Sequence, residues 1–174
     1  MSLILGNLCS VFAMASDGLS STRKTAKGVL WAQCLSQVFY GAGSVIAKGY
    51  SGAAQNVISL LRNFSAMKKW NRRVLEWALV IGAVVLGLAV NNRGVMGLLP
   101  VVANLEYSLV VFSYKENERA LKWAFLVNLA LFAVFNAFIG LITATMGNVA
   151  VFVLTAVYLY RTRNPSETAE KTAQ

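Results

Sequence analysis

The chain has 174 residues, of which 57% are hydrophobic and only 13% are charged, and its mean hydropathy is +0.58. A soluble domain of this size is less apolar and more highly charged, so the composition indicates an integral membrane protein. A net charge of +9 would suggest a nucleic-acid partner in a soluble protein, but here the basic residues fall in short segments between apolar runs, so we expect no nucleic-acid partner.

Seven apolar runs follow one another along the chain, each close to the roughly 20 residues that a helix needs to cross a bilayer. Their residue ranges are 3–19, 29–47, 50–66, 74–92, 95–113, 122–140 and 142–160. No basic residues precede the first run, so we interpret it as a membrane helix and not as a cleaved signal peptide. The joints near Gly49 and Gly140 are tight, and glycine suits such turns. The sequence predicts an all-α, polytopic membrane helix bundle with seven transmembrane helices.

The basic residues gather on one side of this predicted topology. Lys48 and Arg93 fall on the opposite side, and Arg62 lies inside the third run. The remaining 13 of the 16 are Arg23, Lys24, Lys27, Lys68, Lys69, Arg72, Arg73, Lys115, Arg119, Lys122, Arg161, Arg163 and Lys171. The positive-inside rule then predicts an external N-terminus and a cytoplasmic C-terminus. The four tryptophans lie near the same helix ends, where an amphipathic ring is stable.

The run 74–92 has no counterpart, whereas the segments on its two sides match each other. Shifting residues 1–70 by 92 positions places Trp31 on Trp123 and Asn56 on Asn148, and the helix order and loop charges agree. We therefore expect two parallel three-helix repeats, with the extra helix as a linker that restores the orientation. The predicted units are residues 1–66, 67–93 and 94–162, followed by a disordered cytoplasmic tail at 163–174.

Polar side chains inside the apolar runs are candidates for a solute site, because a polar group in hydrocarbon is costly without a partner. Asn56 and Ser59 share one face of the third run, and Asn148 matches Asn56 in the second repeat. Gln37 and Tyr40 extend a polar stripe on the second run; Asn128 and Asn136 extend one on the sixth. Amides supply donors and acceptors for a small polar solute. The same residues would alternatively form hydrogen bonds that hold the helices together.

The fifth run carries two further candidates, a carboxylate and a proline. Glu106 lies deep in the run and would carry a coupling proton or pair with a cation, Arg62 being one partner. Without that pairing we expect the Arg62 guanidinium to reach the membrane interface. Pro100 removes a backbone hydrogen bond and predicts a kink, which would serve as a hinge or simply fit the packing. The pattern leaves open which face of the fifth helix points inward.

Two stretches resemble a known family. Residues 49–64, GYSGAAQNVISLLRNF, and 98–109, LLPVVANLEYSL, are similar to the YgjV family of bacterial inner-membrane proteins, which implies a location in the bacterial inner membrane. The plan of three, one and three helices also resembles SWEET sugar facilitators and PnuC vitamin transporters. The SWEET resemblance implies that Asn56 and Asn148 contact the solute and that Pro100 acts as a gating hinge; Leu8 stands where the first repeat would carry the matching proline.

We expect a membrane transporter or facilitator of a small polar solute of the sugar, nucleoside or vitamin class. It would work by alternating access of two three-helix bundles. The alternative is a non-transporting membrane scaffold or accessory subunit with the same fold. The chain has no histidine, and Cys9 and Cys34 lie in apolar runs, so we expect no enzymatic activity, metal or cofactor. The expected partners are the lipid bilayer and the solute, and the sequence leaves a homo-oligomer open.

Overall fold

The structure is a computed structural model that describes residues 2–70 and 73–162, and these residues form an all-helical bundle. Within them seven α-helices and one 3-10 helix follow in order. These are α1 (Ser2–Thr22), α2 (Ala26–Ile46), α3 (Tyr50–Met67), α4 (Arg73–Ala89), η1 (Gly94–Leu98), α5 (Leu99–Ser113), α6 (Glu118–Phe138) and α7 (Ile142–Arg161). The all-α class is confirmed, and each predicted apolar run overlaps one α-helix, except that the run 95–113 contains η1 as well as α5. The predicted disordered tail lies outside the described residues.

Capping residues explain where several helices begin and end. Thr25 precedes α2 and accepts a hydrogen bond from the Gly28 N–H at 3.2 Å, and Asn117 accepts one from the Ala120 N–H at 3.0 Å before α6. Gly140 has φ +82°, as the turn before α7 requires. The reason given for Gly49 was wrong. Lys48 takes the positive φ there, and Gly49 instead permits close packing, since a Cβ on it would lie 2.8 Å from Ile139 Cδ1.

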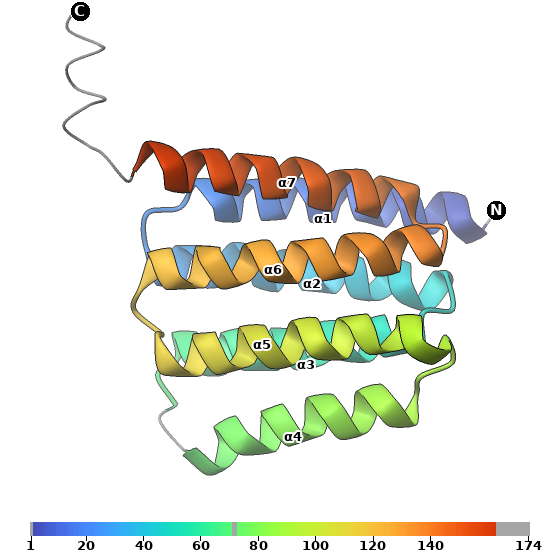
Figure 1. The fold of residues 1–174 in the computed structure, drawn as a ribbon, viewed down its shortest axis with the longest axis horizontal. Helices are drawn as coiled ribbons and strands as arrows, with labels where there is room; N and C mark the ends of the chain where they lie inside the picture. The colour runs from blue at the N-terminus through green and yellow to red at the C-terminus, as the bar shows by residue number, and fades with distance from the viewer. Residues whose placement is uncertain (1, 71–72, 163–174) are drawn as a thin grey trace, which may run out of the picture.

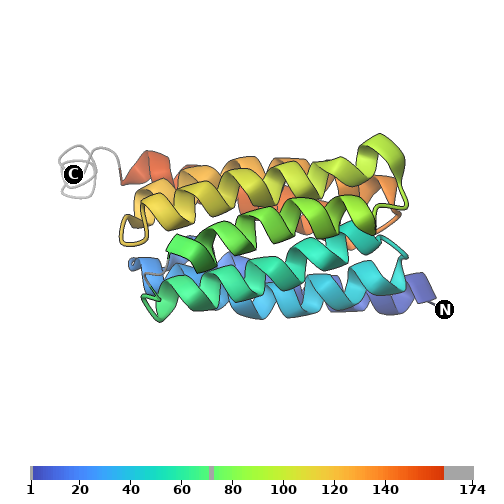
Figure 2. The same ribbon diagram turned by 90° about the horizontal axis from the view of Figure 1, so that it is seen from below.

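The helices form two layers that face each other (Figures 1 and 2). One layer contains α1, α2 and α3 in chain order, and the other contains α5, α6 and α7. Across the gap α1 packs on α7 and α3 packs on α5, while α4 packs against α3 and α5 at one edge. Consecutive helices run in opposite directions, so α1, α3, α5 and α7 share one direction (Figure 1).

The polarity of the bundle is inverted relative to that of a soluble protein. Large apolar side chains such as Val74, Ile4 and Met146 are exposed, whereas amides and hydroxyls are buried between the helices. This distribution is typical of a protein whose outer surface contacts lipid. Four segments of the described chain are long and apolar enough to cross a membrane. They are Ala26–Ile46, Gly94–Ser113, Glu118–Phe138 and Ile142–Arg161.

One end of the bundle collects the basic loops, as the predicted alternation requires. The α1–α2, α3–α4 and α5–α6 connections and the end of α7 lie at this end, which we call the basic end (Figure 1). Trp31, Trp70, Trp77 and Trp123 lie near it and are 52% to 61% exposed. Lys122 differs from the expected loop residue because it is buried inside α6, where its ammonium donates to the Arg23 carbonyl at 3.0 Å.

Candidate functional site

A small polar cavity lies between the two layers. Its volume is about 20 Å³, enough for roughly one water molecule. Ten side chains from five helices line it: Asp17, Gln37, Tyr40, Asn56, Phe125, Asn128, Leu129, Phe132, Asn136 and Asn148. The structure thus brings together six of the seven residues that the sequence singled out for a solute site.

Helix position explains why the two asparagines meet at the cavity. Asn56 is the seventh residue of α3 and Asn148 is the seventh residue of α7, and these helices run in the same direction. Both therefore lie at the same depth, one from each layer. Further pairs of lining residues are also separated by 92 positions, Gln37 with Leu129 and Tyr40 with Phe132.

Four of the lining side chains present polar atoms that have no hydrogen-bond partner in the described part of the chain. The atoms are Asp17 Oδ1, Tyr40 Oη, Asn56 Nδ2 and Asn148 Nδ2. Each of these residues is at least nine-tenths buried. Buried polar atoms normally find a partner, because leaving one unpaired costs about 1–3 kcal/mol. The cavity can therefore bind a small polar ligand that supplies both hydrogen-bond donors and acceptors.

Sequence reasoning missed Asp17. It counted Glu106 as the deep carboxylate, but Asp17 is 2% exposed and its carboxyl lies beside Ser36 and Tyr40 of α2. The first apolar run was expected to end at residue 19, which put Asp17 near the membrane interface. In the structure α1 continues to Thr22, and buried serines follow Asp17. Those small hydroxyl residues, Ser20 and Ser21, were the available signal for a longer helix with a polar inner face.

Two apolar clusters close the cavity toward the two ends of the bundle. The first, which we call the basic-end cluster, contains Leu30, Ala66, Tyr107, Val111, Leu121, Ala124, Phe125, Leu129 and Val151. The second, the far-end cluster, contains Ala13, Tyr40, Ala47, Phe135, Ile139, Leu141 and Ala144. Phe125 and Leu129 belong to both the first cluster and the cavity wall, and Tyr40 belongs to the second and the wall. The cavity therefore lies between two apolar clusters, one toward each end of the bundle.

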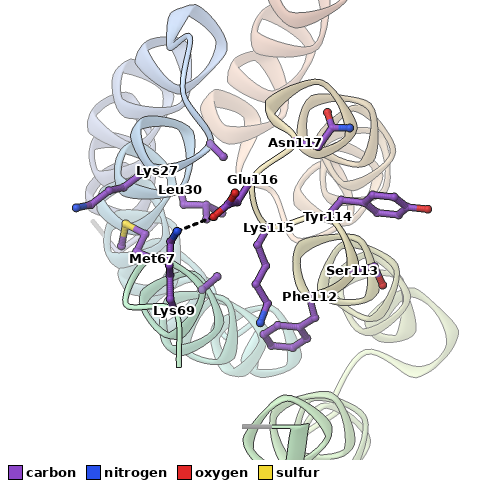
Figure 3. Close-up of a pocket in the computed structure, with 12 residues that line it drawn as sticks. Lys27, Leu30, Met67, Lys69, Phe112, Ser113, Tyr114, Lys115, Glu116 and Asn117 are labelled. Atoms are coloured by element: carbon purple, nitrogen blue, oxygen red, sulfur yellow. Dashed lines mark hydrogen bonds and ion pairs between the residues drawn. The ribbon is translucent and has the colours of Figure 1, made fainter. Parts of the chain in front are cut away.

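An open vestibule of about 700 Å³ lies beyond the basic-end cluster (Figure 3). Its lining includes Leu30 and Ala66 of that cluster, together with Lys27, Lys69 and Glu116. A salt bridge of 2.6 Å joins Lys69 Nζ to Glu116 Oε1, from the connection after α3 to the connection after α5. The Lys69 ammonium lowers the pKa of Glu116, and the Glu116 carboxylate raises the pKa of Lys69.

A second polar network lies between α3 and α5, and it holds Arg62. The guanidinium donates from Nε to Asn63 Oδ1 at 3.0 Å, and from Nη1 to Ser108 Oγ at 3.1 Å and to Asn104 Oδ1, and it lies over the Tyr107 ring. Arg62 is only 1% exposed, so the expectation that it reaches the membrane interface was wrong. Neutral amides and hydroxyls from the facing helix hold it inside the bundle.

Besides Arg62, three further predicted site residues lie away from the cavity. Ser59 donates to Asn104 Oδ1 at 2.9 Å and so belongs to the Arg62 network. Glu106 is half-buried on α5, its Oε2 is buried without a hydrogen-bond partner among the described residues, and no salt bridge joins it to Arg62, which Asn104 and Ser108 hold instead. Pro100 lies in the first turn of α5, directly after η1, where its missing N–H breaks no interior hydrogen bond, so the kink expected there was wrong.

Comparisons with known proteins give one finding. A family model described as Imp-YgjV, bacterial inner membrane protein, matches residues 4–166. No curated protein and no solved structure matches the chain. The match spans nearly the whole length and includes all the residues that line the cavity.

Proposed function

The chain belongs to the Imp-YgjV family of bacterial inner membrane proteins, and from this premise we propose that it is a transporter or facilitator of a small polar solute, of the sugar, nucleoside or vitamin class. The observation that carries the proposal is the polar cavity. It holds unpartnered amide nitrogens of Asn56 and Asn148, one from each layer, at the same depth. A hydroxyl or carbonyl oxygen of a solute would satisfy both donors.

The position of the cavity between two apolar clusters supports a mechanism of alternating access. At about 20 Å³ it is too small for a sugar or nucleoside, so a solute enters only when one apolar cluster opens. The vestibule supplies an aqueous approach to the basic-end cluster, and the far-end cluster closes the opposite path. Rocking of the two layers about the cavity would open one cluster while the other stays closed.

This mechanism needs the membrane topology that the sequence predicts. All seven α-helices cross the membrane, α4 links two parallel repeats, and the basic end faces the cytoplasm. The residue pairs separated by 92 positions around the cavity support the repeat, as does the correspondence of the α1–α7 contact with the α5–α3 contact. The basic loops and tryptophans at one end support the orientation. A homo-oligomer is compatible with this arrangement but is not required by it.

Thermal unfolding of the purified full-length chain with a panel of sugars, nucleosides and vitamins tests the solute site. A solute that binds the folded state raises Tm by mass action. Asn56→Ala and Asn148→Ala each remove an unpartnered donor and should weaken the solute response by about tenfold. Asn63→Ala is the matched control, because Asn63 is a buried asparagine of α3 that does not line the cavity.

The scaffold alternative predicts other results. No solute of any class would then change Tm in the folded protein, or the Asn63 variant would lose the response as fully as the cavity variants. Either outcome would contradict the transporter proposal, because it removes the role of the central asparagines. Transport into vesicles by the wild-type protein, lost in the Asn148→Ala protein, would complete the case for movement of the solute.

A further inference from the structure

The mixed chemistry of the cavity wall points to a second guest besides the solute. The Asn56 and Asn148 amides offer N–H donors, which suit oxygen atoms of a solute. Asp17 Oδ1 and Tyr40 Oη lie beside each other on α1 and α2 at the cavity wall, with Ser36 next to the carboxyl. A carboxylate oxygen and a phenol oxygen are ligands for a cation, and a carboxylate is the group that neutralises its charge.

Charge balance makes a cation necessary at this position. Among the described residues no lysine, arginine or histidine forms an ion pair with Asp17, and the side chain is 2% exposed. An ionised carboxylate buried without a counter-charge is too costly to persist, so it must bind either a proton or another cation. The buried guanidinium of Arg62 does not serve, because it forms no salt bridge with Asp17 and donates to Asn63, Asn104 and Ser108 instead.

The size and composition of the cavity restrict the kind of cation. About 20 Å³ accommodates one species as large as a water molecule, which excludes an organic amine of several carbon atoms in this closed state. A single carboxylate among neutral oxygens suits one positive charge, since divalent ions in proteins are usually held by several carboxylates. The lining residues from α3, α6 and α7 are all neutral, and Tyr40 is the other titratable group in the wall. Arg62 of α3 and Tyr107 of α5 are the titratable groups of the neighbouring network, and Cys34 of α2 and Glu106 of α5 lie within electrostatic range of Arg62.

We propose that the cavity binds a monovalent cation through the Asp17 carboxylate and the Tyr40 hydroxyl, and that this cation is the coupling ion of solute movement. The inference deepens the proposed function and uses the same cavity. It replaces Glu106, which does not line the cavity, with Asp17 as the ion-carrying carboxylate. The proton, Na⁺ and K⁺ share the required chemistry, and the experiment distinguishes them.

The test measures Tm of the full-length protein without solute. One arm titrates NaCl or KCl against N-methylglucamine chloride at constant chloride concentration, and the other lowers the pH from about 8 to about 5.5 in N-methylglucamine. A metal ion that binds the site should raise wild-type Tm by a few degrees over the bulky cation. If the bound cation is the proton, the salts have no specific effect and Tm rises as the pH falls.

Variants assign the response to Asp17. Asp17→Asn keeps the shape of the side chain but removes its charge, so this variant should fold and lose the cation response. Tyr40→Phe should keep a response but shift the cation concentration at its midpoint several-fold. Glu106→Gln is the matched control, a carboxylate outside the cavity, and should respond as the wild type does. The proposal is overturned if Asp17→Asn and Tyr40→Phe keep wild-type responses to salt and to pH, or if Glu106→Gln alone loses them. If the cation response depends on Asp17 but no solute changes Tm, the cation site is supported and the transporter proposal is contradicted. If a solute changes Tm but no cation response depends on Asp17, the cation site is contradicted and the transporter proposal is not.

Discussion

At the scale of single residues, Asn104 connects the buried network around Arg62. Its Oδ1 accepts from Ser59 Oγ at 2.9 Å and from the Arg62 guanidinium, and its Nδ2 donates to Gln55 Oε1 at 2.7 Å. Gln55 in turn donates to the Ala83 carbonyl of α4 at 2.7 Å. One amide therefore links α3, α5 and α4, and it gives a buried guanidinium a neutral acceptor in place of a carboxylate.

Replacing Asn104 should destabilise the protein according to which contacts survive. Asn104→Leu removes every hydrogen bond of the amide, and at roughly 0.6 kcal/mol for each in a membrane protein the total loss is about 2 kcal/mol. Asn104→Asp keeps an acceptor for Arg62 and Ser59 and should cost less. Unfolding in increasing concentrations of a denaturing detergent measures both. Equal losses for the two variants would show that packing, and not the network, determines the effect.

A salt bridge on the surface supplies a pH-dependent prediction at the same scale. Lys69 lowers the pKa of Glu116, so the stabilisation from this carboxylate is present above its unfolded-state pKa and is lost as the pH falls through the folded-state pKa. Glu116 raises the pKa of Lys69, so the Lys69 contribution is lost at high pH instead. Both side chains are exposed, and the effect should be small and screened by salt.

Measuring Tm of the wild type and of Glu116→Gln across a range of pH tests this predicted pH dependence. The difference should be present near neutral pH, vanish in acid, and shrink in concentrated salt. A difference that persists in acid would mean that Glu116 acts by some contact other than its bridge to Lys69. The bridge between Lys115 and Glu76 is unchanged in this variant and serves as an internal reference.

Residue roles were predictable from the sequence only where local pattern decides them. Asn56 and Asn148 follow from helix register alone, because a residue halfway along a membrane helix lies halfway through the bundle wherever the helix packs. The direction of Arg62 depends on Asn104 and Ser108, which come from a helix more than forty residues later. No local sequence pattern predicts such partners, so the sequence alone favoured a guanidinium that reaches the membrane interface.

At the scale of the element, α4 is held by close contact of small residues. A Cβ on Gly87 would lie 2.3 Å from Gln55 Nε2 and 2.5 Å from Val101 Cγ2, whereas a Cβ on Gly82 would meet only Ile58 Cδ1 at 4.0 Å. Gln55 is fixed by its hydrogen bonds, and Val101 is β-branched and buried, so neither can turn away freely. Gly87 therefore sets how near α4 lies to α3 and α5.

Gly87→Ala should lower stability by about 1–3 kcal/mol, because overpacking forces α4 outward. Gly82→Ala is the control on the same helix, and it should be neutral or slightly stabilising because alanine favours a helix more than glycine does. Tm of the two variants against wild type is the measurement. Similar destabilisation by both would mean that helix propensity and not contact governs α4.

Helix boundaries were predictable because hydropathy and loop charge both change where a helix leaves the bilayer. The predicted helix at 95–113 shows what hydropathy cannot predict, namely the type of helix that forms. The sequence is apolar from Val95 to Ala103, yet the chain forms η1 before Pro100 and only then an α-helix. Apolar periodicity does not distinguish a 3-10 turn from an α-helical one, since both bury the same side chains.

At the scale of the whole molecule, the basic-end cluster separates the vestibule from the cavity. Phe125 is buried in this cluster and also lines the cavity, so it is a wall between the two spaces. Removing the ring should connect them and let water reach Asn148. The vestibule is lined by residues of α2, α3 and α5 and by the connections that follow α3 and α5.

Thiol labelling tests the wall. In a protein with Cys9 and Cys34 replaced by serine, Asn148→Cys should react slowly with a charged thiol reagent, and adding Phe125→Ala should speed the reaction by about tenfold or more. Phe138→Ala is the control, because Phe138 is exposed on the outer surface. Fast labelling before the phenylalanine is removed would instead mean that the cluster is open for much of the time.

The gathering of all four tryptophans at the basic end has a practical consequence. Intrinsic fluorescence of this protein reports from a single membrane interface, because none of the emitting rings lies near the opposite end. Quenchers held in the headgroup layer of that leaflet should reach every ring, and quenchers in the other leaflet should reach none. A change in tryptophan emission when a solute or cation is added would thus indicate motion at the basic end. An unchanged emission spectrum would indicate that any motion is confined to the opposite end.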